Sequence, residues 1–286
     1  MRGFIAAIAI FCFSSSFSQP FQIGLFGGIS NYQGDLVDKI YAGRFTKPAI
    51  GLTLNYELSE RFNIRAGFTQ ARVEGDDKYN TKTYLQSRNL NFQSSISEFS
   101  LLAEFNFFNL SNMKWTPYAF GGFAVYHFNP YTQDASGIKY FLKPLSTEGQ
   151  GIAGYNAQPY SLTQLALPIG GGVKYAISDK VRLGLEVGFR KLFTDYLDDL
   201  SSNYVDQFDL LLAKGPKAVE LSYRGDEVPG GDPGYPAKGA QRGGVTEKDS
   251  YYFTGLHLSF RLGSRNGGGL FNKRGKNGYG CPTVPQ

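Results

Sequence analysis

The sequence contains few of the residues that normally build a catalytic or metal centre. Only two cysteines and two histidines occur among its 286 residues. If the N-terminal segment that holds Cys12 is removed, Cys281 has no intrachain partner, so disulfides do not stabilise this fold. Two histidines and one cysteine also make no convincing zinc site. We therefore expect a protein that is not an enzyme and that has no bound metal, no cofactor and no catalytic residues.

Long apolar runs are also absent. No stretch of roughly 18 apolar residues occurs, which excludes a transmembrane helix. The apolar segment at residues 4–13 is too short to span a bilayer, but it follows Arg2 and precedes the small residues Ser16 and Ser18. This pattern is typical of a Sec signal peptide, so we expect residues 1–18 to be cleaved near Gln19.

Acidic residues are missing from the C-terminal end of the chain. Beyond Asp249 there is no Asp or Glu, and the basic residues there account for the whole net charge of +5. These residues are Arg261, Arg265, Lys273, Arg274 and Lys276. The basic character therefore belongs to a tail at residues 263–286, and it gives no reason to expect a nucleic-acid partner.

What the sequence does contain is a repeated alternation of apolar and non-apolar residues with a period of two. In the segment from Val181 to Phe189, for example, every second residue is apolar without a break. Such alternation is typical of strands with one apolar face. We predict eight strands, at residues 21–32, 47–58, 62–74, 95–107, 115–126, 165–177, 181–193 and 251–262.

The connections between these strands alternate in length. Short turns are expected at residues 59–61, 110–114 and 178–180, and long loops at residues 33–46, 75–94, 127–164 and 194–250. An antiparallel up-and-down sheet would collect the short turns at one end and the long loops at the other. In bacterial outer-membrane barrels the short turns and both termini lie in the periplasm, and the long loops face outside.

We therefore predict an all-β protein, with an eight-stranded antiparallel up-and-down transmembrane β-barrel at residues 19–262 and long external loops. It would lie in the outer membrane of a Gram-negative cell, in contact with membrane lipid. An aromatic content of 15% suits the aromatic girdles of such barrels. The alternative is a soluble antiparallel sandwich, which also alternates but does not need its short and long connections sorted to opposite ends.

Charged residues of both signs occupy strand positions opposite the lipid-facing side. An eight-stranded barrel is only wide enough inside for side chains, so these charges should pair, which argues against a diffusion porin. We expect an interior polar plug made by Arg65, Glu98, Glu104, Glu186, Arg190, His257 and Arg261. A second interpretation combines His257, Ser259 and Glu186 into an acyl-hydrolase triad. Packing beside Arg261 is the simpler explanation of that histidine and serine.

The loop at residues 194–209 concentrates acidic side chains. Four of them form a candidate external site: Asp195, Asp198, Asp199 and Asp206. They could supply oxygen ligands to calcium, although the spacing is not that of an EF-hand. The other interpretation is an ordered loop in which Asp and Ser cap turns, while Tyr196, Leu197, Tyr204 and Val205 pack over the barrel mouth. Residues 224–244 are rich in Gly and Pro, which predicts an irregular, mobile excursion.

Several short motifs are spread over nearly the whole mature chain. They are NYQGDL (31–36), PAIGLTLNY (48–56), RNLNFQSSISE (88–98), TPYAFGGFAVYHFNP (116–130), DYLDDLSSNYVD (195–206) and YYFTGLHLSF (251–260), followed by GCP around Cys281. In these motifs and their order the chain resembles the Bacteroidetes outer-membrane barrel family that includes PorG of the type IX (Por) secretion system.

The resemblance implies an accessory or anchoring component of protein export, associated with a periplasmic ring of the PorK lipoprotein and PorN, and not a translocation pore. In that setting we expect the tail to contact the ring through Arg265, Lys273, Arg274 and Lys276. Cys281 would be either an intermolecular thiol or a lone reduced cysteine. No small-molecule substrate is expected. The alternative is an OmpA- or OmpX-like structural or adhesive barrel of the envelope with no secretion role.

Overall fold

The computed structural model describes residues 21–37, 43–244 and 248–262. The predicted signal peptide at residues 1–18 and the predicted basic tail at residues 263–286 lie outside these described residues. No helix within the described ranges is long and apolar enough to cross a membrane.

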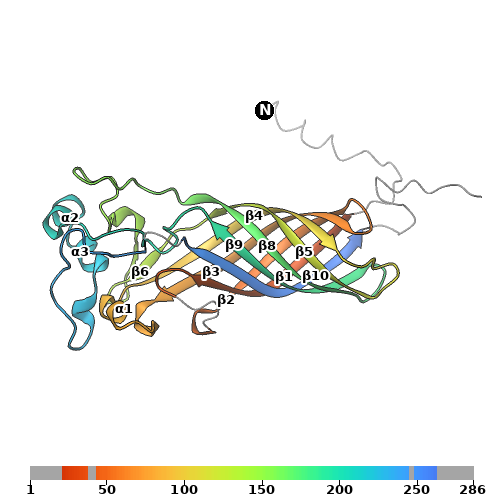
Figure 1. Cartoon of the computed structure of the whole chain (residues 1–286), viewed down its shortest axis with the longest axis horizontal. Coiled ribbons are helices and arrows are strands. Elements are labelled where there is room, and N and C mark those ends of the chain that lie inside the picture. Colours follow the sequence, from red (N-terminus) through yellow and green to blue (C-terminus); the bar gives the residue numbers. More distant parts are fainter. Residues whose placement is uncertain (1–20, 38–42, 245–247, 263–286) are drawn as a thin grey trace, which may run out of the picture.

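Eight long strands form the body of the molecule (Figure 1). They are β1 (Phe21–Gln33), β2 (Lys47–Glu57), β3 (Phe62–Asp76), β4 (Asn91–Asn106), β5 (Trp115–His127), β8 (Thr163–Ala176), β9 (Val181–Leu192) and β10 (Ser250–Leu262). All eight predicted strands are confirmed, with ends that differ by a few residues. The largest difference is at β4, which begins at Asn91 because β3 and β4 stay paired as far as Asp76 and Asn91.

The eight strands close into an antiparallel, up-and-down barrel. Each strand pairs with the long strands before and after it in the chain, and the pairing of β1 with β10 completes the ring. Closure leaves none of these strands with an unpaired edge, which is what a sheet in lipid requires, since no water is present there to satisfy backbone groups. The predicted fold class is therefore confirmed.

Apolar side chains cover the outside of the barrel on all eight strands. Ile50 is 65% exposed and Phe123 is 71% exposed, although both lie in the middle of paired strands. The exposed residues of this apolar belt include Ile23, Leu25, Ile50, Leu52, Phe68, Phe99, Leu101, Phe123, Val125, Leu165, Ile169, Leu185, Val187 and Leu256. A continuous apolar belt of this kind fits lipid and not water. The protein is an outer-membrane β-barrel whose circumference contacts membrane lipid.

Short connections gather at one end of the barrel, here called the turn end. Two of them use the same device, in which Ser59 accepts a hydrogen bond from the Phe62 N–H and Ser178 accepts one from the Val181 N–H. A serine hydroxyl that accepts from the backbone in this way stabilises a tight turn. Aromatic rings are in contact at this end, including Phe108 against Trp115 with ring centroids 5.4 Å apart.

The long connections gather at the opposite end and carry additional elements (Figure 1). These are α1 (Thr83–Arg88), β6 (Tyr131–Gln133), β7 (Lys139–Phe141), α2 (Gln207–Lys214), α3 (Pro216–Ser222) and the short 3-10 segments Gly43–Phe45, Asp77–Tyr79, Lys143–Leu145 and Gly225–Glu227. Strands β6 and β7 form a small hairpin attached to β4. We call the described residues of these connections the cap: 34–37, 43–46, 77–90, 128–162, 193–244 and 248–249.

The largest of three buried apolar clusters in the described residues runs from the cap end of the barrel into the cap. It includes Phe26 and Phe253 on the strands, and Leu142, Leu197 and Leu200 in the cap. The cap therefore packs onto the cap end of the strands as part of the same folded unit.

Candidate functional site

Ion pairs inside the barrel occur at three levels along its axis. The middle level joins β3, β4, β5, β8 and β9. Arg65 Nη1 lies 2.6 Å from Glu186 Oε2 and 3.8 Å from Glu104 Oε2. Lys174 also pairs with Glu104, and the Tyr118 hydroxyl donates to Glu186 at 2.7 Å. Because all five side chains are buried, the two carboxylates neutralise the two cations across the bore.

The level nearest the cap contains a bidentate ion pair between β9 and β4. Arg190 donates from Nε and Nη2 to the two carboxylate oxygens of Glu98, at 3.0 and 3.1 Å. The Tyr251 hydroxyl donates to the same carboxylate at 2.8 Å, and the Arg190 guanidinium lies 4.1 Å from the centre of the Phe253 ring. This geometry satisfies the carboxylate from both sides and fixes the arginine between strands.

The third level lies at the turn end, around Glu57 of β2. Its carboxylate accepts from Arg261 at 2.5 Å and lies 2.7 Å from Arg182, and the amide of Gln22 also donates to it. Arg261 is only partly buried, unlike the other members of the predicted plug.

Little free space remains between these levels. A cavity of about 20 Å³ lies between Arg65, Glu186, Arg190 and His257, which is room for roughly one water molecule. Phe120 fills the neighbouring space because Gly170 faces it, where a Cβ atom would lie 2.5 Å from the ring. The interior along these described strands is packed with side chains.

The structure does not assemble the acyl-hydrolase alternative. His257 Nε2 lies 2.7 Å from the Thr53 hydroxyl, and no hydrogen bond joins His257 to Glu186 or to Ser259 among these described residues. Glu186 is instead occupied by Arg65 and Tyr118. The carboxylate therefore does not orient the histidine as a catalytic triad requires.

The seven predicted plug residues lie on the inner side of the sheet, six of them buried and Arg261 partly buried, and several of their partners were not predicted. Lys174, Arg182, Tyr118 and Tyr251 all contact the predicted carboxylates or Glu57. Lys174 lies an even number of residues after Ala166 in β8, so both face the interior, and this spacing could have identified Lys174. The glycines at 170–172 interrupt the alternation of apolar residues between them.

Buried ion pairs also hold the cap together. The Arg88 guanidinium donates to both oxygens of Asp77, at 2.7 and 2.8 Å, and thereby fastens α1 to the end of β3. Arg242 lies 3.1 Å from Glu148 and 3.8 Å from Asp199, which joins two long connections. Burial raises the pKa of Asp199 to about 6, although the charge of Arg242 acts in the opposite direction.

The four predicted acidic residues make different contacts in the cap. Asp198 is buried and accepts a hydrogen bond from the Tyr32 hydroxyl at 2.5 Å, and Asp199 is buried beside it. Asp206 caps the N-terminus of α2, and Asp195 is half-buried. No group of three or more His, Cys, Asp or Glu side chains in the described ranges is arranged to hold a metal ion. An ion at this loop stays a prediction that the arrangement does not favour.

Three carboxyl groups of this region have raised pKa values. Burial raises the pKa of Asp195 to about 7. Burial and the charges of neighbouring carboxylates, Asp249 and Asp35 for Asp198 and Asp195 and Asp35 for Asp249, raise the pKa values of Asp198 and Asp249 as well. Since these groups retain protons more strongly than free carboxylates do, the charge of the cap changes near neutral pH.

Two of the four residues expected over the barrel mouth pack with the strands there: Leu197 is buried in the core shared with the strands, and Tyr196 is partly buried against it. Tyr204 and Val205 are buried within the cap, Tyr204 against Tyr223 and Val205 in a separate cluster with Leu210 of α2.

The segment at residues 224–244 is irregular, as expected, and its two ends are anchored by Arg224 and Arg242, which are buried and ion-paired. Asp226, Asp232 and Lys238 between them are exposed, and the mobility of this part stays a prediction.

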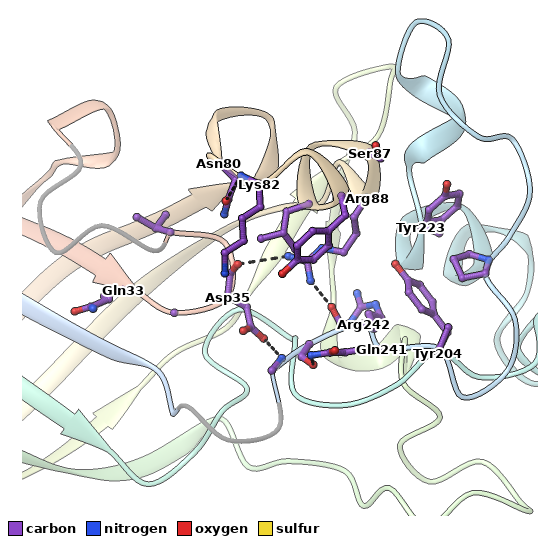
Figure 2. Close-up of a pocket in the computed structure, with 18 of the residues that line it drawn as sticks. Gln33, Asp35, Asn80, Lys82, Ser87, Arg88, Tyr204, Tyr223, Gln241 and Arg242 are labelled. Atoms are coloured by element: carbon purple, nitrogen blue, oxygen red, sulfur yellow. Dashed lines mark hydrogen bonds between the residues drawn. The ribbon is translucent and has the colours of Figure 1, made fainter.

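A cavity of about 730 Å³ opens in the cap between the β1–β2 connection, the α1 region and the β9–β10 connection (Figure 2). Figure 2 shows Asn80, Lys82 and Arg88 on one side and Tyr204 and Tyr223 on the other. Asp35, whose carboxylate accepts from the Gly244 N–H at 2.6 Å, lies at its lower edge, and burial raises the pKa of that carboxyl. This volume lies in the usual range for small-molecule sites.

The predicted tail contacts Arg265, Lys273, Arg274 and Lys276, together with Cys281, lie outside the described residues. Their role stays a prediction.

Comparison with known proteins identifies a family and a set of similar folds. Residues 1–211 match the model of the family described as Domain of unknown function (DUF6089). No curated protein matches the chain significantly. Among solved structures, it is similar to Neisserial surface protein A at 9% identity and a TM-score of 0.42, with 85% of this chain and 97% of that chain covered.

Two further structures are similar at the same level. The attachment invasion locus protein Ail of Yersinia pestis, in complex with the heparin analogue sucrose octasulfate, has 8% identity and a TM-score of 0.41, with 85% of this chain and 97% of that chain covered. A major outer membrane protein from Thermus thermophilus has 11% identity and a TM-score of 0.40, with 85% of this chain and 99% of that chain covered.

Proposed function

The chain belongs to the family described as Domain of unknown function (DUF6089), and we propose a function for it. It is a non-enzymatic outer-membrane anchor that serves as an accessory component of the type IX secretion system. The anchor role is supported by the occluded interior. The secretion role is supported by the resemblance of its sequence motifs to the barrel family that includes PorG.

The observation that carries the anchor role is the set of ion pairs that cross the bore. Arg190 with Glu98, Arg65 with Glu186, and Lys174 with Glu104 join strands that are not neighbours in the barrel. A solute could pass only if these buried pairs separated, which would leave uncompensated charges in the interior. Function therefore belongs to the two ends of the barrel and not to its lumen.

In the proposed orientation the cap faces the outside and the turn end faces the periplasm. This orientation follows the rule that outer-membrane barrels have short periplasmic turns and longer external loops. A periplasmic ring of the PorK and PorN type would then meet the turn end and the tail at residues 263–286. The basic residues Arg265, Lys273, Arg274 and Lys276 would attract an acidic surface on that ring.

The secretion role is tested by affinity purification from detergent-solubilised outer membranes. We expect ring proteins to co-purify with the full chain, and to be lost when Arg265, Lys273, Arg274 and Lys276 are all changed to Gln. A matched control changes Lys273 and Lys276 to Arg, which keeps the charge and should keep the ring proteins. Recovery of the barrel alone, under conditions that leave the ring intact, would contradict the proposal.

A second candidate is an adhesive or structural barrel of the envelope with no secretion role. The observation that favours it is the cavity in the cap, which would face the cell exterior. Loss of ring co-purification together with retained binding at the cap would support this candidate over the first.

A further inference from the structure

The cap cavity contains polar groups that the protein leaves without partners. The Tyr204 hydroxyl and the Asn80 side-chain nitrogen have no hydrogen-bond partner, although Tyr204 is only 4% exposed and Asn80 only 5% exposed. Both residues line the same cavity, and Figure 2 shows them on different sides of it. Buried donors of this kind are nearly always satisfied in folded proteins, so these two groups on one cavity are suited to hydrogen-bond the acceptor atoms of a ligand.

Aromatic rings form one wall of this cavity. Tyr204 and Tyr223 meet nearly edge to face, with ring centroids 6.1 Å apart, and both contact Tyr235 behind them. Tyr84, on α1, is 67% exposed and also lines the cavity. Tyrosine offers a broad, rigid face and a polar hydroxyl at low cost in conformational entropy, which suits a ligand with both apolar and polar sides.

The charge around the cavity is balanced. Arg88 and Arg242 are held by Asp77 and Glu148, so their charges are compensated within the protein. The remaining charged residues of the lining are two lysines and two aspartates: Lys82, Lys248, Asp35 and Asp232. A polyanion would gain little electrostatic attraction from a lining with balanced charge, and a neutral ligand would meet no net charge there.

The walls offer no free strand to pair with a peptide. Gln33 and Ser250 line the cavity, but they pair with each other across β1 and β10 in the closed barrel. Gly34 and Val37 form a bridge between their own backbones. Addition of a peptide strand to a sheet edge is therefore not available among these lining residues, and recognition must come from side chains.

We propose that the cap cavity binds a short neutral oligosaccharide. Tyr204 and Asn80 donate hydrogen bonds to its hydroxyl oxygens, and the tyrosine wall packs against the apolar faces of its sugar rings. The site does not depend on the proposed secretion role, because it lies in the cap and not at the turn end. Burial raises the pKa of Tyr204 to about 12, which keeps its hydroxyl protonated and able to donate at neutral pH.

Calorimetric titration of the purified full chain in detergent tests this proposal. The probes are maltotriose, cellotriose, lactose and N,N′-diacetylchitobiose, together with the neutral part of the core oligosaccharide of lipopolysaccharide from the same membranes, freed of acyl chains, phosphate and Kdo. Binding of the core oligosaccharide alone would identify the membrane's own glycan as the source, and binding of a free saccharide would identify an external one. Either outcome supports the site. Absence of binding by both kinds of probe at millimolar concentration would overturn it.

Matched tyrosine variants distinguish the site from non-specific binding. Tyr204→Phe should weaken binding roughly tenfold, the effect of one lost hydrogen bond to the ligand. It should leave Tm unchanged or higher, because that hydroxyl has no partner in the protein. Tyr235→Phe is the control, since Tyr235 belongs to the same ring cluster but its hydroxyl bonds to Ser222 and it does not line the cavity.

Asn80→Asp provides a second variant that keeps the side-chain oxygen used by the Lys82 N–H but replaces the free donor with an acceptor. It should weaken binding to a similar extent. Equal affinities of Tyr204→Phe and Tyr235→Phe would overturn the proposal. Preferential binding of dextran sulfate, lost in Lys82→Gln, would also overturn it, because the ligand would then be a polyanion.

Discussion

The barrel interior and the cap both bury charged side chains, but they arrange them differently. In the barrel, the charges stand at alternate positions of long strands, and Arg65 and Lys174 neutralise Glu104 and Glu186 across a bore with almost no free space. In the cap, Arg88 and Arg242 join irregular connections and surround a cavity of about 730 Å³. Buried ion pairs therefore fill the interior of the barrel, whereas in the cap they hold together the connections that line a cavity.

The largest expected effect is on the barrel. Arg190→Ala leaves the buried Glu98 carboxylate without its cation, and should lower the free energy of unfolding by about 3–5 kcal/mol. The measurement is urea unfolding of the refolded protein in liposomes. The double variant Glu98→Leu with Arg190→Leu should be less destabilised than the single one, because it leaves no unpaired charge. A single variant as stable as the wild type would show that this pair does not support the barrel.

A smaller and local effect is expected in the cap. Arg242→Ala removes the cation that Glu148 and Asp199 share, so the β9–β10 connection should become sensitive to protease while the barrel keeps its heat-modifiable migration on gels. Arg61→Ala, in the exposed turn between β2 and β3, is the control and should change neither property. If Arg242→Ala lost heat-modifiable migration as well as protease resistance of the β9–β10 connection, the cap and the barrel would not unfold separately.

The smallest effect is a pH dependence of the cap. The pKa of Asp195 is raised to about 7 and that of Asp199 to about 6, from an ordinary value of 3.8. The folded cap therefore binds more protons than the unfolded cap in this window, so its stability is highest below the ordinary value and falls as the pH rises through 6 and 7.

Hydrogen-exchange protection of residues 197–205, corrected for intrinsic exchange rates, measures this dependence. Protection should be greater at pH 5 than at pH 8, with a slope of at most about tenfold per pH unit for each proton. Asp195→Asn should reduce the change of protection with pH, whereas the control Asp226→Asn, at an exposed residue of the cap, should not. A profile that rises with pH would contradict the assigned direction.

The sequence predicts the strands well because each has an apolar and a non-apolar face, and the period of two is visible in any one strand. It also places Glu98, Glu186 and Arg190 on the inner face. It does not predict which of them meet, since partners depend on the register between strands. Lys174 escaped notice because the glycines before it, at 170–172, interrupt the alternation.

The sequence predicts less about the contacts within the cap. Its segments have no common period, and its ion pairs join residues far apart, such as Glu148 and Arg242. The Gly- and Pro-rich composition of residues 224–244 therefore predicted irregularity correctly but gave no sign that Arg224 and Arg242 would be buried. The unpartnered hydroxyl of Tyr204 depends on the final packing of three connections, and no local pattern encodes it.

Single-channel recording in planar bilayers tests the closed-bore account most directly. Purified protein, with its folded state verified by heat-modifiable migration, should insert without producing a steady conductance at neutral pH, because the ion pairs of Arg65, Lys174 and Arg190 cross the interior. A stable open channel in the wild-type protein would contradict the account, since the barrel would then be a pore and not an anchor.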